Sequence, residues 1–139
     1  MKESLKKAVR ERAKFCCEYC LAQSQFSADT FSIEHILPLS KNGQSVLDNL
    51  AFSCQCCNNH KFTATQGIDP IIGSVVKLYN PRSDIWIEHF EWYEDFTEII
   101  GISAIGRVTV QRLDLNRVGL LNLRRVLFQA GLHPPFEKF

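Results

Sequence analysis

All six cysteines of this 139-residue chain lie in two short clusters, CCEYC at residues 16–20 and CQCC at residues 54–57. Neighbouring cysteines bridge each other poorly because disulfide geometry is specific. The N-terminal segment MKESLKKAVRERAKF has no apolar stretch of the kind found in a secretory signal. Thiols in the cytosol stay reduced. We therefore predict a cytoplasmic protein whose cysteines bind a metal.

The spacing within the clusters predicts the metal and its role. Each cluster contains a C-x2-C pair, and two such pairs supply the four thiolates of a tetrahedral Zn²⁺ site. A site with no open coordination position is structural rather than catalytic. The predicted ligands are Cys17, Cys20, Cys54 and Cys57. Cys16 or Cys56 could replace a neighbour, and a redox pair or plain buried thiols are the alternatives.

The segment between the clusters is typical of two strands followed by a short helix. FSIEHI at residues 31–36 alternates like a strand, and Pro38 ends it. Asn42-Gly43 favours a tight turn. LAFSC, residues 50–54, predicts a second strand, and CQCCNNHKF after it predicts a helix. The predicted zinc ion would hold the open end of this unit together.

The order of these motifs resembles that of an HNH endonuclease. After the first C-x2-C come an acid-His pair, H-x2-P-x-S-x-x-G, D-N-L at residues 48–50, and C-x2-C-N-x2-K. The resemblance covers residues 16–61. It implies an α+β fold with a ββα-metal (His-Me finger) core, which we place at about residues 14–65.

The resemblance also assigns roles to individual residues. His35 would be the general base that activates water, because a neutral imidazole accepts a proton near pH 7. Asn49 would brace the loop and orient the His35 ring. Glu34, where most related proteins carry Asp, and Asn58 would hold one catalytic Mg²⁺ or Mn²⁺.

A rival ligand and two DNA contacts complete the expected site. His60 competes with Asn58 for the cation, because residues 58 and 60 would point about 200° apart on a helix and cannot both reach one ion. Lys61 and Arg82 are expected to contact phosphates.

The rest of the chain predicts a basic N-terminal helix within residues 1–15 and an accessory part at about residues 75–133. In that part we expect a β-hairpin over 83–103 that turns near 94–97, and helices over 103–114 and 117–131. The helix arginines could contact phosphates; they are Arg107, Arg112, Arg117, Arg124 and Arg125. We treat residues 1–139 as a single domain.

These features together predict a metal-dependent DNA endonuclease that hydrolyses phosphodiester bonds, acting as a monomer or homodimer without a membrane partner. The alternative is a catalytically inactive zinc-knuckle module that binds nucleic acid. A zinc-stabilised protein-interaction domain is a third interpretation, which the acidic, aromatic segment 84–98 supports. The net charge of +1 does not by itself favour a polyanion, but residues 1–14 carry six Lys/Arg against two Glu.

Overall fold

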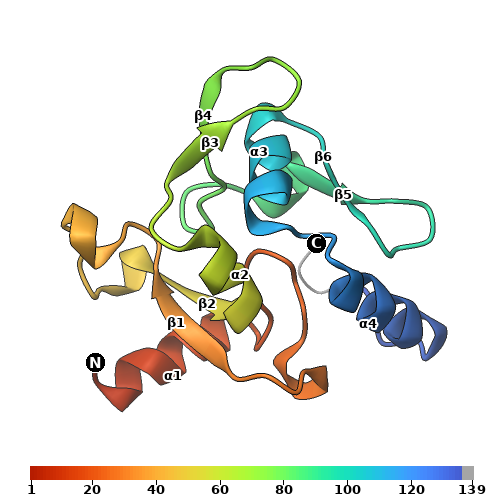
Figure 1. The fold of residues 1–139 in the computed structure, drawn as a ribbon. Coiled ribbons are helices and arrows are strands. Elements are labelled where there is room, and N and C mark those ends of the chain that lie inside the picture. The colour runs from red at the N-terminus through yellow and green to blue at the C-terminus, as the bar shows by residue number, and fades with distance from the viewer. Residues whose placement is uncertain (136–139) are drawn as a thin grey trace.

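The structure is a computed structural model that describes residues 1–135. These residues form an α+β fold of four α-helices and three two-stranded antiparallel sheets (Figure 1). The helices are α1 (Glu3–Arg12), α2 (Gln55–Lys61), α3 (Ala104–Leu113) and α4 (Val118–Gln129). The strands are β1 (Phe31–His35), β2 (Leu50–Cys54), β3 (Gln66–Ile68), β4 (Val75–Lys77), β5 (Phe90–Trp92) and β6 (Ile99–Gly101).

The β1–β2 hairpin lies between two helices. Side chains alternate along a strand, so Ile33 and His35 lie on one face of the hairpin and Glu34 on the other. Helix α1 covers the first face, where its buried Val9 belongs to the same apolar cluster as Leu50 and Ile33. Helix α2 follows β2 directly and contacts the second face, where Glu34 lies.

The loop between β1 and β2 depends on a predicted turn. Asn42 adopts the left-handed conformation with φ of 69°, which Asn tolerates better than most residues. A Cβ at Gly43 would lie 1.7 Å from the carbonyl oxygen of Leu37, so only glycine fits there. The Asn42-Gly43 dipeptide thus folds the loop back toward the end of β1.

The C-terminal part follows the predicted order of elements. Helices α3 and α4 are one or two residues shorter at each end than predicted, and the Ser103 side chain caps α3 by accepting from the Gly106 N–H. The β5–β6 hairpin is present, but its strands are three residues long and a 3₁₀ turn at Trp86–Glu88 precedes them. The β3–β4 hairpin was not predicted.

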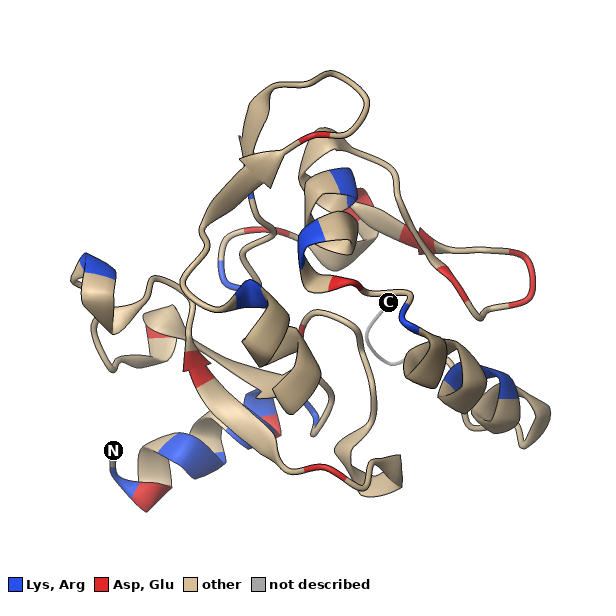
Figure 2. Cartoon of the chain, in the orientation of Figure 1, with Lys and Arg blue, Asp and Glu red and all other residues tan. Residues whose placement is uncertain are grey.

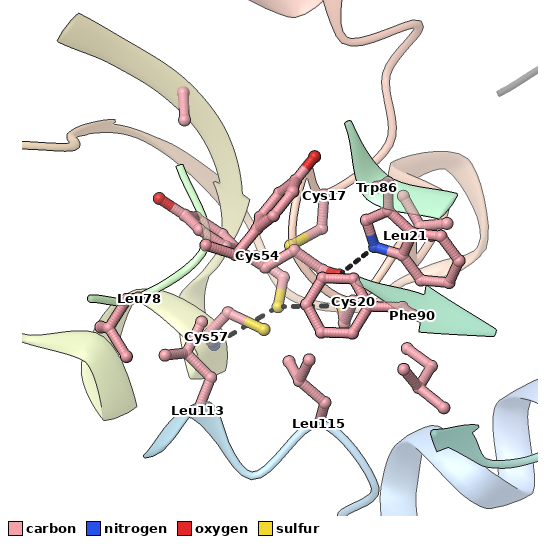
Figure 3. Close-up of a cluster of buried hydrophobic side chains, with 14 of the residues drawn as sticks. Cys17, Cys20, Leu21, Cys54, Cys57, Leu78, Trp86, Phe90, Leu113 and Leu115 are labelled. Carbon is pink, nitrogen blue, oxygen red and sulfur yellow. Dashed lines mark hydrogen bonds between the residues drawn. The ribbon is translucent and has the colours of Figure 1, made fainter. Parts of the chain in front are cut away.

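A single buried cluster draws side chains from both parts of the chain. Figure 3 shows the four cysteines of the predicted zinc site beside Trp86, Phe90 and Leu113. The matched segment and the C-terminal elements therefore share one apolar core. Within residues 1–135, no helix combines the length and the apolar composition that a membrane-spanning helix requires.

Candidate functional site

The four predicted zinc ligands converge. The sulfur atoms of Cys17, Cys20, Cys54 and Cys57 all lie within 4.8 Å of one another, and all four residues are buried. The Sγ atoms of Cys20 and Cys54 are 3.7 Å apart. Zn–S bonds of about 2.3 Å in a tetrahedron give a sulfur–sulfur separation of about 3.8 Å. The donor set and its spacing therefore fit Zn²⁺, and this distance is too long for a disulfide.

Local structure explains how the cysteines meet. Cys17 and Cys20 lie in the tight turn after α1, where the Leu21 N–H donates to the Cys17 carbonyl at 2.9 Å. Cys54 ends β2 and caps α2, since its Sγ accepts from the Cys57 N–H at 3.4 Å. Among residues 1–135, these four form the one group of three or more His, Cys, Asp or Glu side chains arranged to share an ion.

The two remaining cysteines lie outside this group, which agrees with the predicted register. Cys16 is buried, whereas Cys56 on α2 is exposed. Because α2 turns Cys54 and Cys57 inward, a residue between them is carried outward.

Arg117 approaches the sulfurs from the start of α4, a contact that no sequence pattern indicates. Its guanidinium donates to Cys54 Sγ at 3.2 Å and to Cys57 Sγ at 3.6 Å. Burial lowers the Arg117 pKa, but the sulfurs of Cys57 and Cys20 outweigh burial and raise it. The predicted phosphate contact is thus wrong for Arg117, which neutralises thiolate charge instead.

Two other helix arginines are also engaged inside the protein. Arg107 forms a bidentate pair with the buried Asp69, with nitrogen–oxygen distances of 3.0 and 2.7 Å, and so ties the β3–β4 hairpin to α3. Arg124 is 3% exposed and donates to the carbonyls of Thr97 and Leu115. Arg107 is thus engaged in an ion pair and Arg124 in hydrogen bonds to backbone carbonyls, which leaves neither free for the predicted phosphate contact.

His35 lies at the end of β1, where it is half-buried. Its Nε2 is 2.8 Å from the hydroxyl of Ser45, and its Nδ1 makes no hydrogen bond with any residue of the described part of the chain. Partial burial lowers the His35 pKa, which keeps the ring neutral at pH 7. If Nε2 donates to Ser45, the Nδ1 lone pair is available to accept a proton.

Asn49 braces the loop that carries Ser45. Its Oδ1 accepts from the Leu37 N–H at 2.8 Å, and its Nδ2 donates to the carbonyls of Leu37 and Gln44, each at 3.0 Å. The ring of His35 contacts Ser45 rather than Asn49. Asn49 therefore acts on His35 through the loop, and Ser45 is a residue that sequence reasoning missed although it lies between two recognised motifs.

Glu34 faces α2 and is 4% exposed. The Tyr19 hydroxyl donates to one carboxylate oxygen, and the Lys61 ammonium lies 3.4 Å from the other. Burial raises the Glu34 pKa, while Lys61 and Tyr19 act in the opposite direction. Both oxygens of Glu34 are thus occupied by donors of the protein itself.

Lys61 and Arg82 do not face solvent as DNA contacts would. Lys61 is 2% exposed and also donates to the Ile36 carbonyl at 3.0 Å. Arg82 is paired with Glu18 and donates to the Leu50 carbonyl at 3.2 Å. Each cation is thus engaged by a buried carboxylate in this structure, which leaves neither of them free for the predicted phosphate contact.

The two rival cation ligands lie on different sides of α2. His60 is 3.9 Å from Asp114, which follows α3. Asn58 precedes Lys61 by three residues and so shares its side of the helix. Its side chain makes no hydrogen bond with the described residues. The oxygens of Glu34 and Asn58 suit a hard cation, but an ion at Glu34 requires Lys61 to move.

Comparisons with known proteins agree with the motif analysis. Residues 17–63, about a third of the chain, match the model of the HNH endonuclease family. The chain is 29% identical to the Septu protein PtuB of Bacillus thuringiensis over 139 residues. That alignment includes 99% of this chain, which spans about half (51%) of the length of that relative. No solved structure gives a significant match.

Proposed function

We propose that the segment matching the HNH family hydrolyses phosphodiester bonds of DNA as a metal-dependent endonuclease. The observation that carries this proposal is the environment of His35. Its ring lies at a strand end, is partly open to solvent, and has one nitrogen held by Ser45 and one without a partner among residues 1–135. The family match at residues 17–63 supports the same chemistry.

The proposed role of His35 is general base. With Nε2 donating to Ser45, Nδ1 takes a proton from the attacking water while that water approaches phosphorus opposite the departing oxygen. The lowered pKa keeps the imidazole in its neutral, proton-accepting form at pH 7. Asn49 holds the loop so that the hydrogen bond that His35 Nε2 donates to Ser45 fixes the ring orientation.

We further propose that Glu34 and Asn58 hold one Mg²⁺ or Mn²⁺ during catalysis. Such a cation, when bound, would stabilise negative charge on the phosphate and on the leaving oxygen. Its entry requires the Lys61 ammonium to leave Glu34, because both carboxylate oxygens are engaged by donors. The position of His60 beside Asp114 supports Asn58 as the helix ligand.

The remaining proposals concern the frame of the site. We propose that β1, β2 and α2 are a ββα-metal core held by a structural Zn²⁺ on the four clustered cysteines. The shared buried cluster supports one domain over the whole chain. We place the protein in the cytoplasm, where thiolate ligands remain reduced, as a monomer or a homodimer.

Plasmid cleavage tests the activity. Purified protein is incubated with supercoiled plasmid and Mg²⁺ or Mn²⁺, in parallel with EDTA and with His35→Ala. We expect cleavage that EDTA abolishes and that His35→Ala lowers by about 10²–10⁴-fold, the usual contribution of a general base. A His35→Ala protein that folds normally and cuts at the wild-type rate would show that His35 is not the base.

One observation favours the second candidate, a zinc-stabilised module that binds nucleic acid without cutting it. The Glu34–Lys61 pair places an ammonium group where the cation is expected to bind. Retention of that pair in the presence of divalent cations would leave the site without its metal. Binding of DNA without any cleavage in Mg²⁺ or Mn²⁺ would establish this candidate.

A further inference from the structure

The ion pairs of Lys61 with Glu34 and of Arg82 with Glu18 engage the two cations that the sequence suggested as phosphate contacts. We propose that helix α1 supplies the phosphate contacts, as a surface that binds the backbone of duplex DNA beside His35. This inference rests on the proposed function. It assigns a role to residues that precede the segment matching the HNH family, residues 17–63.

The position of α1 relative to His35 is the first argument. Ile33 and His35 point from the same face of β1, and α1 covers that face through Val9, which is fully buried. Helix α1 therefore packs over the row of side chains that ends at His35. DNA bound at His35 would have α1 at its side.

A hydrogen-bonded contact fixes the end of the helix nearest to the site. The Arg12 guanidinium donates to the Leu50 carbonyl at 2.6 Å and to the Leu47 carbonyl at 2.9 Å. Leu50 is the residue of β2 paired with His35. Since directly opposed residues of antiparallel strands are about 5 Å apart, the C-terminal end of α1 lies one strand away from His35.

The positive charge of residues 1–14 also favours DNA binding by α1. Residues 1–14 carry six basic and two acidic side chains, a net charge of +4 (6 − 2) in a protein whose total is +1. Each of the two acids pairs with one base, Glu3 with Arg10 and Glu11 with Lys7. The Lys7–Glu11 pair is exposed and 3.8 Å long, so it holds Lys7 only weakly. Lys2, Lys7 and Lys14 are all exposed.

The distribution of the other charges supports the same orientation. Figure 2 shows basic residues along α1, while acidic residues gather on the β5–β6 hairpin on the opposite side of the molecule. A polyanion is attracted to the first surface and repelled by the second. Exposed lysines on α1 and directly beside its two ends, next to a proposed phosphodiesterase site, match the chemistry of the DNA backbone.

Salt-dependent binding of labelled duplex DNA tests this proposal, with fluorescence anisotropy as the readout and His35→Ala as the background that prevents cutting. The variant Lys7→Gln/Lys14→Gln removes two charges near α1. Arg112→Gln/Arg125→Gln removes two exposed charges from α3 and α4 and is the matched control; these two arginines were also predicted to contact phosphates, so the comparison decides between the two surfaces. Lys7→Arg/Lys14→Arg keeps the charge and tests whether charge itself is responsible.

Each phosphate contact contributes about 0.9 to the slope of log K against log salt. We therefore expect Lys7→Gln/Lys14→Gln, the α1 variant, to reduce the slope of log K against log salt by about 1.8 and to weaken DNA binding at low salt. The control and the arginine variant should keep the parent slope. An unchanged slope for the α1 variant, or an equal reduction in the control, overturns the inference alone. A parent protein that binds no DNA contradicts the proposed function as well.

Discussion

Replacement of Arg117 tests whether the C-terminal helices complete the predicted zinc site. The Arg117 guanidinium lies 3.2 Å from Cys54 Sγ and 3.6 Å from Cys57 Sγ. Four thiolates around one Zn²⁺ carry a formal charge of about −2. Arg117 offsets half of that charge, and Arg117→Gln would remove the positive charge while leaving a side chain that can still donate a hydrogen bond.

The expected magnitude follows from distance and screening. Two unit charges about 4 Å apart interact by about 4 kcal/mol at an effective dielectric constant of 20. Arg117 is only partly buried, so solvent screening reduces the attraction between its charge and the zinc-bound thiolates to about 1.4–2.8 kcal/mol. This energy equals the 10- to 100-fold loss of metal affinity that is typical for residues that support metal ligands. We therefore expect Arg117→Gln to bind Zn²⁺ about 10- to 100-fold more weakly.

Equilibrium competition with a chromophoric zinc chelator measures this affinity. Arg107→Gln is the control, because it breaks a comparable arginine pair with Asp69 and contacts none of the four cysteines. We expect this control to lower thermal stability without changing zinc affinity. Wild-type zinc affinity in Arg117→Gln, or equal losses in both variants, would refute the electrostatic reasoning.

Four further predictions follow from single contacts. The rate of DNA cleavage (kcat/KM) should fall as pH drops through a value below the ordinary histidine pKa of 6.5, because burial lowers the pKa of His35 and only its neutral form accepts a proton. Ser45→Ala removes the hydrogen bond to the His35 ring and should lower the cleavage rate about tenfold, which is part of what a general base supplies. A fall in the cleavage rate with a midpoint at or above pH 6.5 would contradict the assignment of His35 as the general base. Lys61→Met should cost about 3–5 kcal/mol in denaturant unfolding, because it leaves Glu34 buried and unpaired, and adding Glu34→Gln should recover most of this loss. Hydrogen bonds from Arg107 lower the pKa of Asp69 to about 2, so this pair should stabilise the fold above pH 3.8 and lose its effect as pH falls through about 2; thermal unfolding of Asp69→Asn should be less dependent on pH in that window.

The elements around the site could be predicted because local chemistry specifies them. FSIEHI alternates as a strand, LAFSC is a short apolar run typical of one, and the C-x2-C spacing predicted the ligand group that the structure brings together. The β3–β4 hairpin carried no comparable signal. Its strands are three residues long, and tertiary packing selects Gly67, where a Cβ would lie 2.7 Å from Val108. The contact of Ser45 with His35 could not be predicted from the sequence, because only the folded loop brings the two side chains together.

Charged residues were misassigned for a common physical reason. Burying an unpaired charge costs several kcal/mol, so an interior cation requires an interior acceptor. The acceptors are Glu34 for Lys61, Glu18 for Arg82, and the cysteine sulfurs for Arg117. Each acceptor is at least 27 positions away in the sequence, so no local pattern reveals it. The cations left for a DNA backbone are those without such an acceptor, and several of them lie in residues 2–14. For this reason we propose α1, rather than the end of α2, as the source of the phosphate contacts.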